Sequence, residues 1–155
     1  MPNVINPNHK FWMQIALEEA DAASVSGEIP IGAIVVAGDR IIGRGHNRSI
    51  ECSDPTGHAE IMALRDAGAR VENYRLPEAI MYVTIEPCPM CAGALLHARV
   101  GGLVFGARDP EIGAAGSAMN LLESPLANHQ CQVIAGILES DCRRRLELFF
   151  ERLRL

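Results

Sequence analysis

The sequence predicts an α/β protein in which a five-stranded mixed sheet carries helices on both faces. Segments of strand character alternate with segments of helical periodicity, and two adjacent strand-like segments give a hairpin signal near the start. The chain has 155 residues, of which 48% are hydrophobic, a size and composition typical of one globular domain. We therefore expect a single domain over residues 1–155.

The N-terminal third of the chain predicts a helix, a hairpin and a loop. Apolar residues recur every three or four positions over about residues 9–26, which indicates an amphipathic helix. Residues 29–37 are almost all apolar and a second run follows at 40–44, so we expect a β-hairpin turned at residues 38–39. The first of these strands has the pattern of a strand buried on both faces. The polar segment 48–57 predicts a loop.

The middle of the chain predicts two further helices and two strands. Helical periodicity resumes over about residues 58–69. A strand rich in β-branched and aromatic residues is expected at 79–85, and another strand at 101–105. Between them we expect a short helix over about residues 89–99, since Pro89 suits the first position of a helix.

The C-terminal part predicts a connection, a strand and a last helix. Residues 107–117 are rich in glycine and are expected to form a connection without regular structure. The fifth strand is expected at 133–138 and the last helix over about residues 140–154. The buried stripe of this helix is expected to consist of Leu146, Phe149, Phe150 and Leu153.

Charge, cysteine content and hydropathy restrict the function classes. The formal net charge is −5, which argues against coating of nucleic acid by bulk electrostatics, so we expect no DNA partner. The five cysteines are an odd number, and residues 1–7 have neither a basic nor an apolar signal region, so we expect reduced thiols in the cytoplasm. No apolar run approaches the roughly 20 residues needed to cross a membrane.

Two short motifs carry the chemistry: His58-Ala59-Glu60 and Pro87-Cys88-Pro89-Met90-Cys91. At the residue frequencies of this chain, a Pro-Cys-x-x-Cys match is expected only about 0.01 times by chance, against about 0.4 times for His-x-Glu. Each motif opens a predicted helix, and the positive field at a helix N-terminus favours a thiolate over a thiol. The second motif is therefore specific, whereas the first motif alone is not. The position of both motifs at helix starts supports a shared chemical role.

Two thiolates and one imidazole predict a zinc site formed by His58, Cys88 and Cys91. Borderline-soft donors of this kind suit Zn²⁺ better than Mg²⁺ or Ca²⁺. Three protein ligands leave one tetrahedral position for water, whose pKa zinc lowers from about 15.7 toward about 7. Glu60 lies two residues after His58, and we expect it to act as a general base and then as a general acid.

The motifs also allow a closed structural zinc site, in which Cys52 from the preceding loop supplies a fourth ligand. The remaining histidines have no metal-ligand partner at useful spacing, so we interpret them as surface or core residues. Cys131 and Cys142 are interpreted as small buried hydrophobic residues. From spacing alone, Asn47 and Asp109 fit turn residues better than substrate contacts.

The sequence resembles the zinc-dependent nucleobase deaminases and, within them, the bacterial tRNA adenosine deaminases. The bare zinc signature is shared with deaminases of cytosine, guanine and riboflavin precursors. Two segments narrow the resemblance to the tRNA enzymes. These segments are Phe105-Gly106-Ala107-Arg108-Asp109 and Gly113-Ala114-Ala115-Gly116-Ser117.

The resemblance implies a three-layer cytidine-deaminase-like fold and one Zn²⁺ per subunit, bound by His58, Cys88 and Cys91. It implies an RNA-editing hydrolase that converts the wobble adenosine of a tRNA anticodon loop to inosine, with Glu60 moving the proton. It further implies that Asn47 contacts the target nucleoside, that Asp109 contacts a neighbouring nucleotide, and that the protein is a homodimer. The alternatives are a deaminase of a free base or nucleoside such as guanine, and a binding module with structural zinc.

Overall fold

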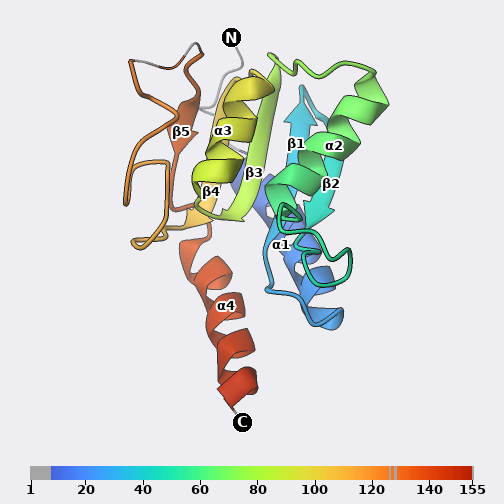
Figure 1. The fold of residues 1–155 in the computed structure, drawn as a ribbon, viewed down its shortest axis with the longest axis vertical. Coiled ribbons are helices and arrows are strands. Elements are labelled where there is room, and N and C mark those ends of the chain that lie inside the picture. Colours follow the sequence, from blue (N-terminus) through green and yellow to red (C-terminus); the bar gives the residue numbers. More distant parts are fainter. Residues whose placement is uncertain (1–7, 126, 128, 155) are drawn as a thin grey trace.

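The computed structural model describes residues 8–125, 127 and 129–154 (Figure 1). Residues 1–7, interpreted above as lacking a signal region, lie outside this part. The described residues form helices α1 (His9–Val25), α2 (Ala59–Val71), α3 (Pro89–His97) and α4 (Glu139–Arg154) and strands β1 (Gly32–Ala37), β2 (Arg40–His46), β3 (Ala79–Ile85), β4 (Gly102–Ala107) and β5 (Gln132–Ile134). None of these described helices is long and apolar enough to cross a membrane.

The five strands form one mixed sheet in the order β2-β1-β3-β4-β5. β1 pairs antiparallel with both β2 and β3, whereas β3, β4 and β5 are parallel to one another. Strands β2 and β3 therefore run in the same direction on either side of β1. This confirms the predicted mixed sheet and its initial hairpin.

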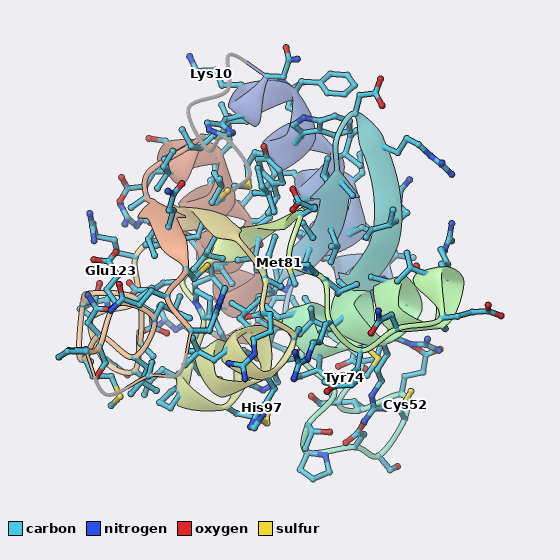
Figure 2. All side chains as sticks on the ribbon, turned by 90° about the horizontal axis from the view of Figure 1, so that it is seen from above. Lys10, Cys52, Tyr74, Met81, His97 and Glu123 are labelled. Atoms are coloured by element: carbon cyan, nitrogen blue, oxygen red, sulfur yellow. The ribbon has the colours of Figure 1, made fainter. Side chains whose placement is uncertain are left out.

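Strand residues alternate between the two faces of the sheet, and each face has its own core. Ala33, Val35 and Met81 pack with α2 and α3, whereas Ile34 and Tyr82 pack with α1 and α4. In Figure 1, α2 and α3 lie in front of the sheet and α1 lies behind it. Figure 2 shows Met81 in the middle of the molecule, surrounded by side chains. The three-layer arrangement expected from the sequence is therefore confirmed.

Some predicted boundaries differ from the structure. The first strand begins at Gly32 because Pro30 has no backbone N–H to donate to a ladder. Helix α2 continues through Gly68 to Val71, and the left-handed backbone of Glu72 then ends it. The fifth strand is shorter than expected, with only three residues.

The predicted buried stripe of the last helix is wrong for its C-terminal half. Only Cys142 of α4 is fully buried, whereas Phe150 and Leu153 are 40% and 67% exposed. Figure 1 shows the reason, since the end of α4 extends beyond the sheet. Amphipathic periodicity predicted the helix correctly, but it does not say whether the apolar face has a neighbour.

Candidate active site

The predicted metal ligands lie at the N-termini of α2 and α3. His58 is the residue directly before α2, Cys88 is directly before α3, and Cys91 lies in the first turn of α3. These helices follow β2 and β3, which run in the same direction, so both helices begin at the same edge of the sheet. The carboxyl ends of parallel strands are where α/β proteins commonly place a ligand. The topology thus brings the two motifs together although His58 and Cys88 are 30 positions apart in sequence.

The donor atoms of His58, Cys88 and Cys91 converge within 4.8 Å of one another. His58 Nδ1 lies 3.6 Å from Cys88 Sγ and 3.5 Å from Cys91 Sγ. A tetrahedral zinc ion with bonds of about 2.0 Å to nitrogen and about 2.3 Å to sulfur would separate such donors by about 3.5 Å. The spacing and the soft donor set therefore fit Zn²⁺.

Of the three side chains, Cys88 is the one whose environment favours the charge state that binds a metal. A hydrogen bond from the Cys91 thiol, aided by His58, lowers the pKa of Cys88 to about 4. The same contact, together with burial, raises the pKa of Cys91, so Cys91 keeps the proton that it donates to the Cys88 thiolate. Hydrogen bonding to Cys88 raises the pKa of His58. One thiolate is therefore already present at neutral pH.

Glu60 is the second residue of α2, in the first turn of the helix, and is only 3% exposed. Burial raises the pKa of its carboxyl group to about 7. Among the described residues, the group with metal-ligand geometry contains only His58, Cys88 and Cys91, so Glu60 is left out of the ligand set. A buried carboxylate beside a metal group, but outside its ligand set, is suited to proton transfer.

Cys52 does not complete a closed site. It is exposed on the 48–57 loop and is absent from the ligand group found in the described part of the chain. Figure 2 shows it on the outside of the molecule. The closed structural site considered from the sequence is therefore not what the structure forms.

Asn47 and Asp109 occupy loop positions that differ in their contacts. Asn47 follows β2, is 6% exposed, and its side-chain amide has no hydrogen bond within the described ranges. Asp109 follows β4, and its Oδ1 accepts hydrogen bonds from the amides of Glu111 and Ile112 at 3.1 and 3.3 Å. One carboxylate oxygen of Asp109 thus stabilises a turn, whereas the side chain of Asn47 stabilises no turn within the described ranges.

Two buried carboxylates that the sequence did not single out hold the loops beside the metal group. Glu28 is 1% exposed and accepts hydrogen bonds from the backbone amides of Ile50 and Glu51. Glu86, which is 2% exposed, does the same for the loop after β4. A charged residue in an apolar context is the signal that could have pointed to them.

The interpretation of the other histidines and cysteines as structural residues agrees with their contacts. His9 is buried with its Nδ1 2.8 Å from the Tyr82 hydroxyl, and His129 contacts the carbonyl oxygen of Val100 at 2.8 Å. Cys131 and Cys142 are buried free thiols, and burial raises the pKa of each to about 12.

Comparison with known proteins connects this arrangement to deaminases. Residues 7–149 match the MafB19-like deaminase family. The tRNA-specific adenosine deaminase of Haemophilus influenzae is 50% identical over 143 residues, which is 92% of this chain and 83% of the relative. The sequence similarity therefore covers both motifs and the fold around them.

Solved structures of two kinds of deaminase share the fold. A structure from work on A-to-I editing by tRNA:A34 deaminases at the wobble position of transfer RNA superposes with a TM-score of 0.85. It is 42% identical, and the match covers 88% of this chain and 99% of the other. Guanine deaminase from Nitrosomonas europaea has a TM-score of 0.80 at 25% identity, with 96% and 87% coverage. The fold is thus common to both, while sequence similarity is much higher to the tRNA enzymes.

Proposed function

Because this chain belongs to the tRNA-specific adenosine deaminases, we propose that it converts adenosine at the wobble position of a tRNA anticodon loop to inosine. The reaction consumes water and releases ammonia: a C6–O bond forms, and the bond from C6 to the amino nitrogen breaks. The observation that carries the proposal is a donor group of tetrahedral spacing beside the buried Glu60. The proposed substrate places the reaction in the cytoplasm.

We propose that His58, Cys88 and Cys91 hold one Zn²⁺ in each subunit. The donor separations of 3.5 and 3.6 Å support this assignment. When bound, zinc supplies Lewis-acid chemistry that makes water nucleophilic at neutral pH. Because the pKa of Cys88 is lowered, this sulfur is already deprotonated at neutral pH, and metal binding does not have to displace a proton from it.

Glu60 is proposed to move the protons of the reaction. Its carboxylate would take a proton from the attacking water and deliver it toward the purine, so that the amino group leaves as ammonia. Glu60 lies two residues after His58 on the first turn of α2, which places it beside the ligand group without being part of it. Burial keeps bulk water from competing for this proton.

Asn47 and Asp109 are proposed as substrate contacts. Asn47 brings a nearly buried amide without a protein partner among the described residues, and an amide can both donate to and accept from a nucleoside. Asp109 uses Oδ1 in its turn and leaves Oδ2 for a hydroxyl or amino group of a neighbouring nucleotide. An anticodon loop offers such splayed bases, which is the common mode of single-stranded RNA recognition.

A homodimer is proposed through the cleft between α2 and α3. This cleft has a volume of about 750 Å³ and is lined mainly by apolar side chains from both helices, including Ile61, Leu64 and Ala94. Tyr74 and His97, both labelled in Figure 2, also line it, and Tyr74 is 70% exposed. Arg65 and Glu72 border the same cleft, so a two-fold pairing of identical faces can match opposite charges.

The test of the proposed activity compares substrates and a Glu60 variant. Purified zinc-loaded protein should form inosine in an anticodon stem-loop and leave free adenosine and free guanine unchanged. Glu60→Ala should keep its zinc and lose at least about 10²-fold in kcat, because only proton transfer is removed. Turnover of the free bases without turnover of the stem-loop would favour the guanine-deaminase alternative.

A further inference from the structure

Glu86 is a buried carboxylate without a cation, tied to the loop that follows β4. It is 2% exposed, and no Lys, Arg or His of the described ranges lies within ion-pair distance of it. Oε1 accepts a hydrogen bond from the Asp109 amide at 3.1 Å and another from the Ser117 hydroxyl. Oε2 accepts hydrogen bonds from the amides of Ala115 and Ser117 at 3.0 Å each. Four donors from one loop thus neutralise a charge that burial would otherwise make costly.

The loop over residues 108–118 is shaped to fit this carboxylate. A Cβ atom at Gly113 would overlap the Glu86 carboxyl group, so glycine leaves the space that the charge occupies. The Ala114 amide donates to the carbonyl oxygen of Pro87 at 2.8 Å, and the Glu86 amide donates to that of Ala107 at 2.8 Å. The loop is therefore joined to the segment that leads directly into Cys88.

Both ends of the loop depend on the same side chain. The Asp109 amide is bound at one end and Ser117 at the other, eight positions apart in sequence. Because the Asp109 amide is held by Glu86 and its Oδ1 is held by the turn, the direction of the remaining oxygen depends on both contacts.

We propose that Glu86 is a positioning residue for RNA: it fixes the 108–118 loop so that Asp109 meets the nucleotide beside the target adenosine. This role rests on the proposed function. Glu86 acts through Asp109 and does not touch the reacting atoms. A rigid loop contributes to substrate binding rather than to the chemical step. Loss of this role should therefore change KM and not kcat.

The test is Glu86→Gln in the zinc-loaded protein, with the anticodon stem-loop as substrate. The amide group that replaces one oxygen points its N–H donors at two of the loop's donors, so two of the four hydrogen bonds are lost with little change in side-chain volume. We expect KM to rise about tenfold, kcat to stay within about twofold, and zinc content to be unchanged. The amides of Asp109, Ala115 and Ser117 should exchange with deuterium faster in the free protein.

The loss of negative charge in Glu86→Gln would by itself change KM in the opposite direction. The direction of the measured change in KM therefore separates the two effects. Removal of a negative charge by itself strengthens binding to a polyanion, so electrostatics alone would lower KM. Glu111→Gln removes the same charge from an exposed position of the same loop and serves as the matched control. KM unchanged or lowered in Glu86→Gln, or loss of zinc from this variant, would overturn the proposal.

Ser117→Ala is the second variant if Glu86→Gln does not fold. It removes one donor to the carboxylate at the end of the loop far from Cys88 in sequence, and KM should rise about threefold. An unchanged KM would overturn the proposal. Wild-type protein that does not convert the stem-loop overturns the proposed function as well, and that result is separate because it needs no variant.

Discussion

The buried carboxylates of this protein show that burial alone does not set their protonation. Burial raises the pKa of Glu60 to about 7, because hydrogen bonds to its charged form are too few to compensate. Burial also acts on Glu86, but hydrogen bonds from Ser117 and from the loop amides outweigh it and lower the pKa. Glu60 can therefore exchange a proton near neutral pH, whereas Glu86 keeps its charge and its tether.

Metal binding should depend on Cys88 and not on Cys52. Cys52→Ala removes an exposed thiol that lies outside the ligand group and should leave the zinc content of the purified protein unchanged. Cys88→Ala removes one of three ligands and should lower zinc affinity by several orders of magnitude. Atomic absorption on dialysed protein measures both, and zinc loss from Cys52→Ala would contradict the open site.

Tyr82 should make stability depend on alkaline pH. Burial raises the pKa of its hydroxyl from 10.0 to about 12, so the folded state keeps a proton that the unfolded state has lost between these values. The corresponding stability is fully present below pH 10 and is lost as pH rises through 12. The difference between these two pKa values corresponds to about 2 to 3 kcal/mol in the free energy of unfolding.

The Tyr82→Phe variant isolates this effect. Cys131 and Cys142 titrate in an overlapping range because burial also raises the pKa of each, but they are present in both proteins. The free energy of unfolding of the variant should be lower than that of the wild type at neutral pH, since the variant loses the contact with His9. Between pH 10 and 12 this free energy should decrease less steeply in the variant. Urea unfolding at a series of pH values gives the two slopes, and equal slopes would disprove the prediction.

At the residue level, the sequence predicted the three side chains that form the metal group. It did not predict the buried carboxylates that hold the neighbouring loops. His58, Cys88 and Cys91 were predictable because each stands at a helix start where its spacing has a known chemical use. Glu28 and Glu86 were not, since their partners are backbone amides about 20 to 30 residues away. Such contacts depend on loop conformation, which side-chain periodicity does not encode.

At the level of elements, the close approach of α2 to β2 determines where the active-site residues stand. A Cβ at Gly45 would lie 2.5 Å from the Ala63 amide nitrogen and 2.6 Å from the Ala59 carbonyl oxygen. Both are backbone atoms of α2 and cannot rotate away. Since α2 begins directly after His58 and carries Glu60, the glycine allows the helix start to lie against the sheet.

Gly45→Ala should therefore destabilise the protein and weaken its metal site together. The added methyl group forces α2 outward, and overpacking of this kind typically costs about 1–3 kcal/mol. Gly93→Ala is the matched control, because a Cβ there meets nothing within 4 Å and alanine favours a helix by up to about 1 kcal/mol. Denaturant unfolding and zinc content of both variants are the measurements. A Gly45→Ala protein as stable as the wild type would contradict this account.

Element boundaries were predictable where local chemistry ends an element and less so elsewhere. The strand at Ala79–Ile85 has the predicted bounds, because Pro87 prevents its continuation. Helix α4 has nearly the predicted bounds, but its exposed end could not be foreseen. The exposure of an amphipathic face depends on its neighbours in three dimensions, and the sequence of one element does not contain them.

At the level of the whole molecule, the sheet separates two faces with different tasks. The face with α2 and α3 carries the metal ligands at the helix starts and the apolar cleft farther along the same helices. The face with α1 and α4 carries a second core and none of the three ligands. A dimer through the cleft would leave the N-termini of α2 and α3 at its margin, where the partner chain could contribute to substrate binding.

The wild-type protein should therefore be a dimer at micromolar concentration, and Ala94→Arg should be a monomer. Ala94 is a half-buried residue of α3 that lines the cleft, and arginine there adds both bulk and an unpaired charge at the centre of the proposed interface. Val25→Arg places the same side chain at the end of α1, where Val25 is 90% exposed, and should remain dimeric. Size-exclusion chromatography with light scattering gives the mass of each protein. A monomeric wild type, or an Ala94→Arg variant that stays dimeric, would show that the cleft does not bind a second copy.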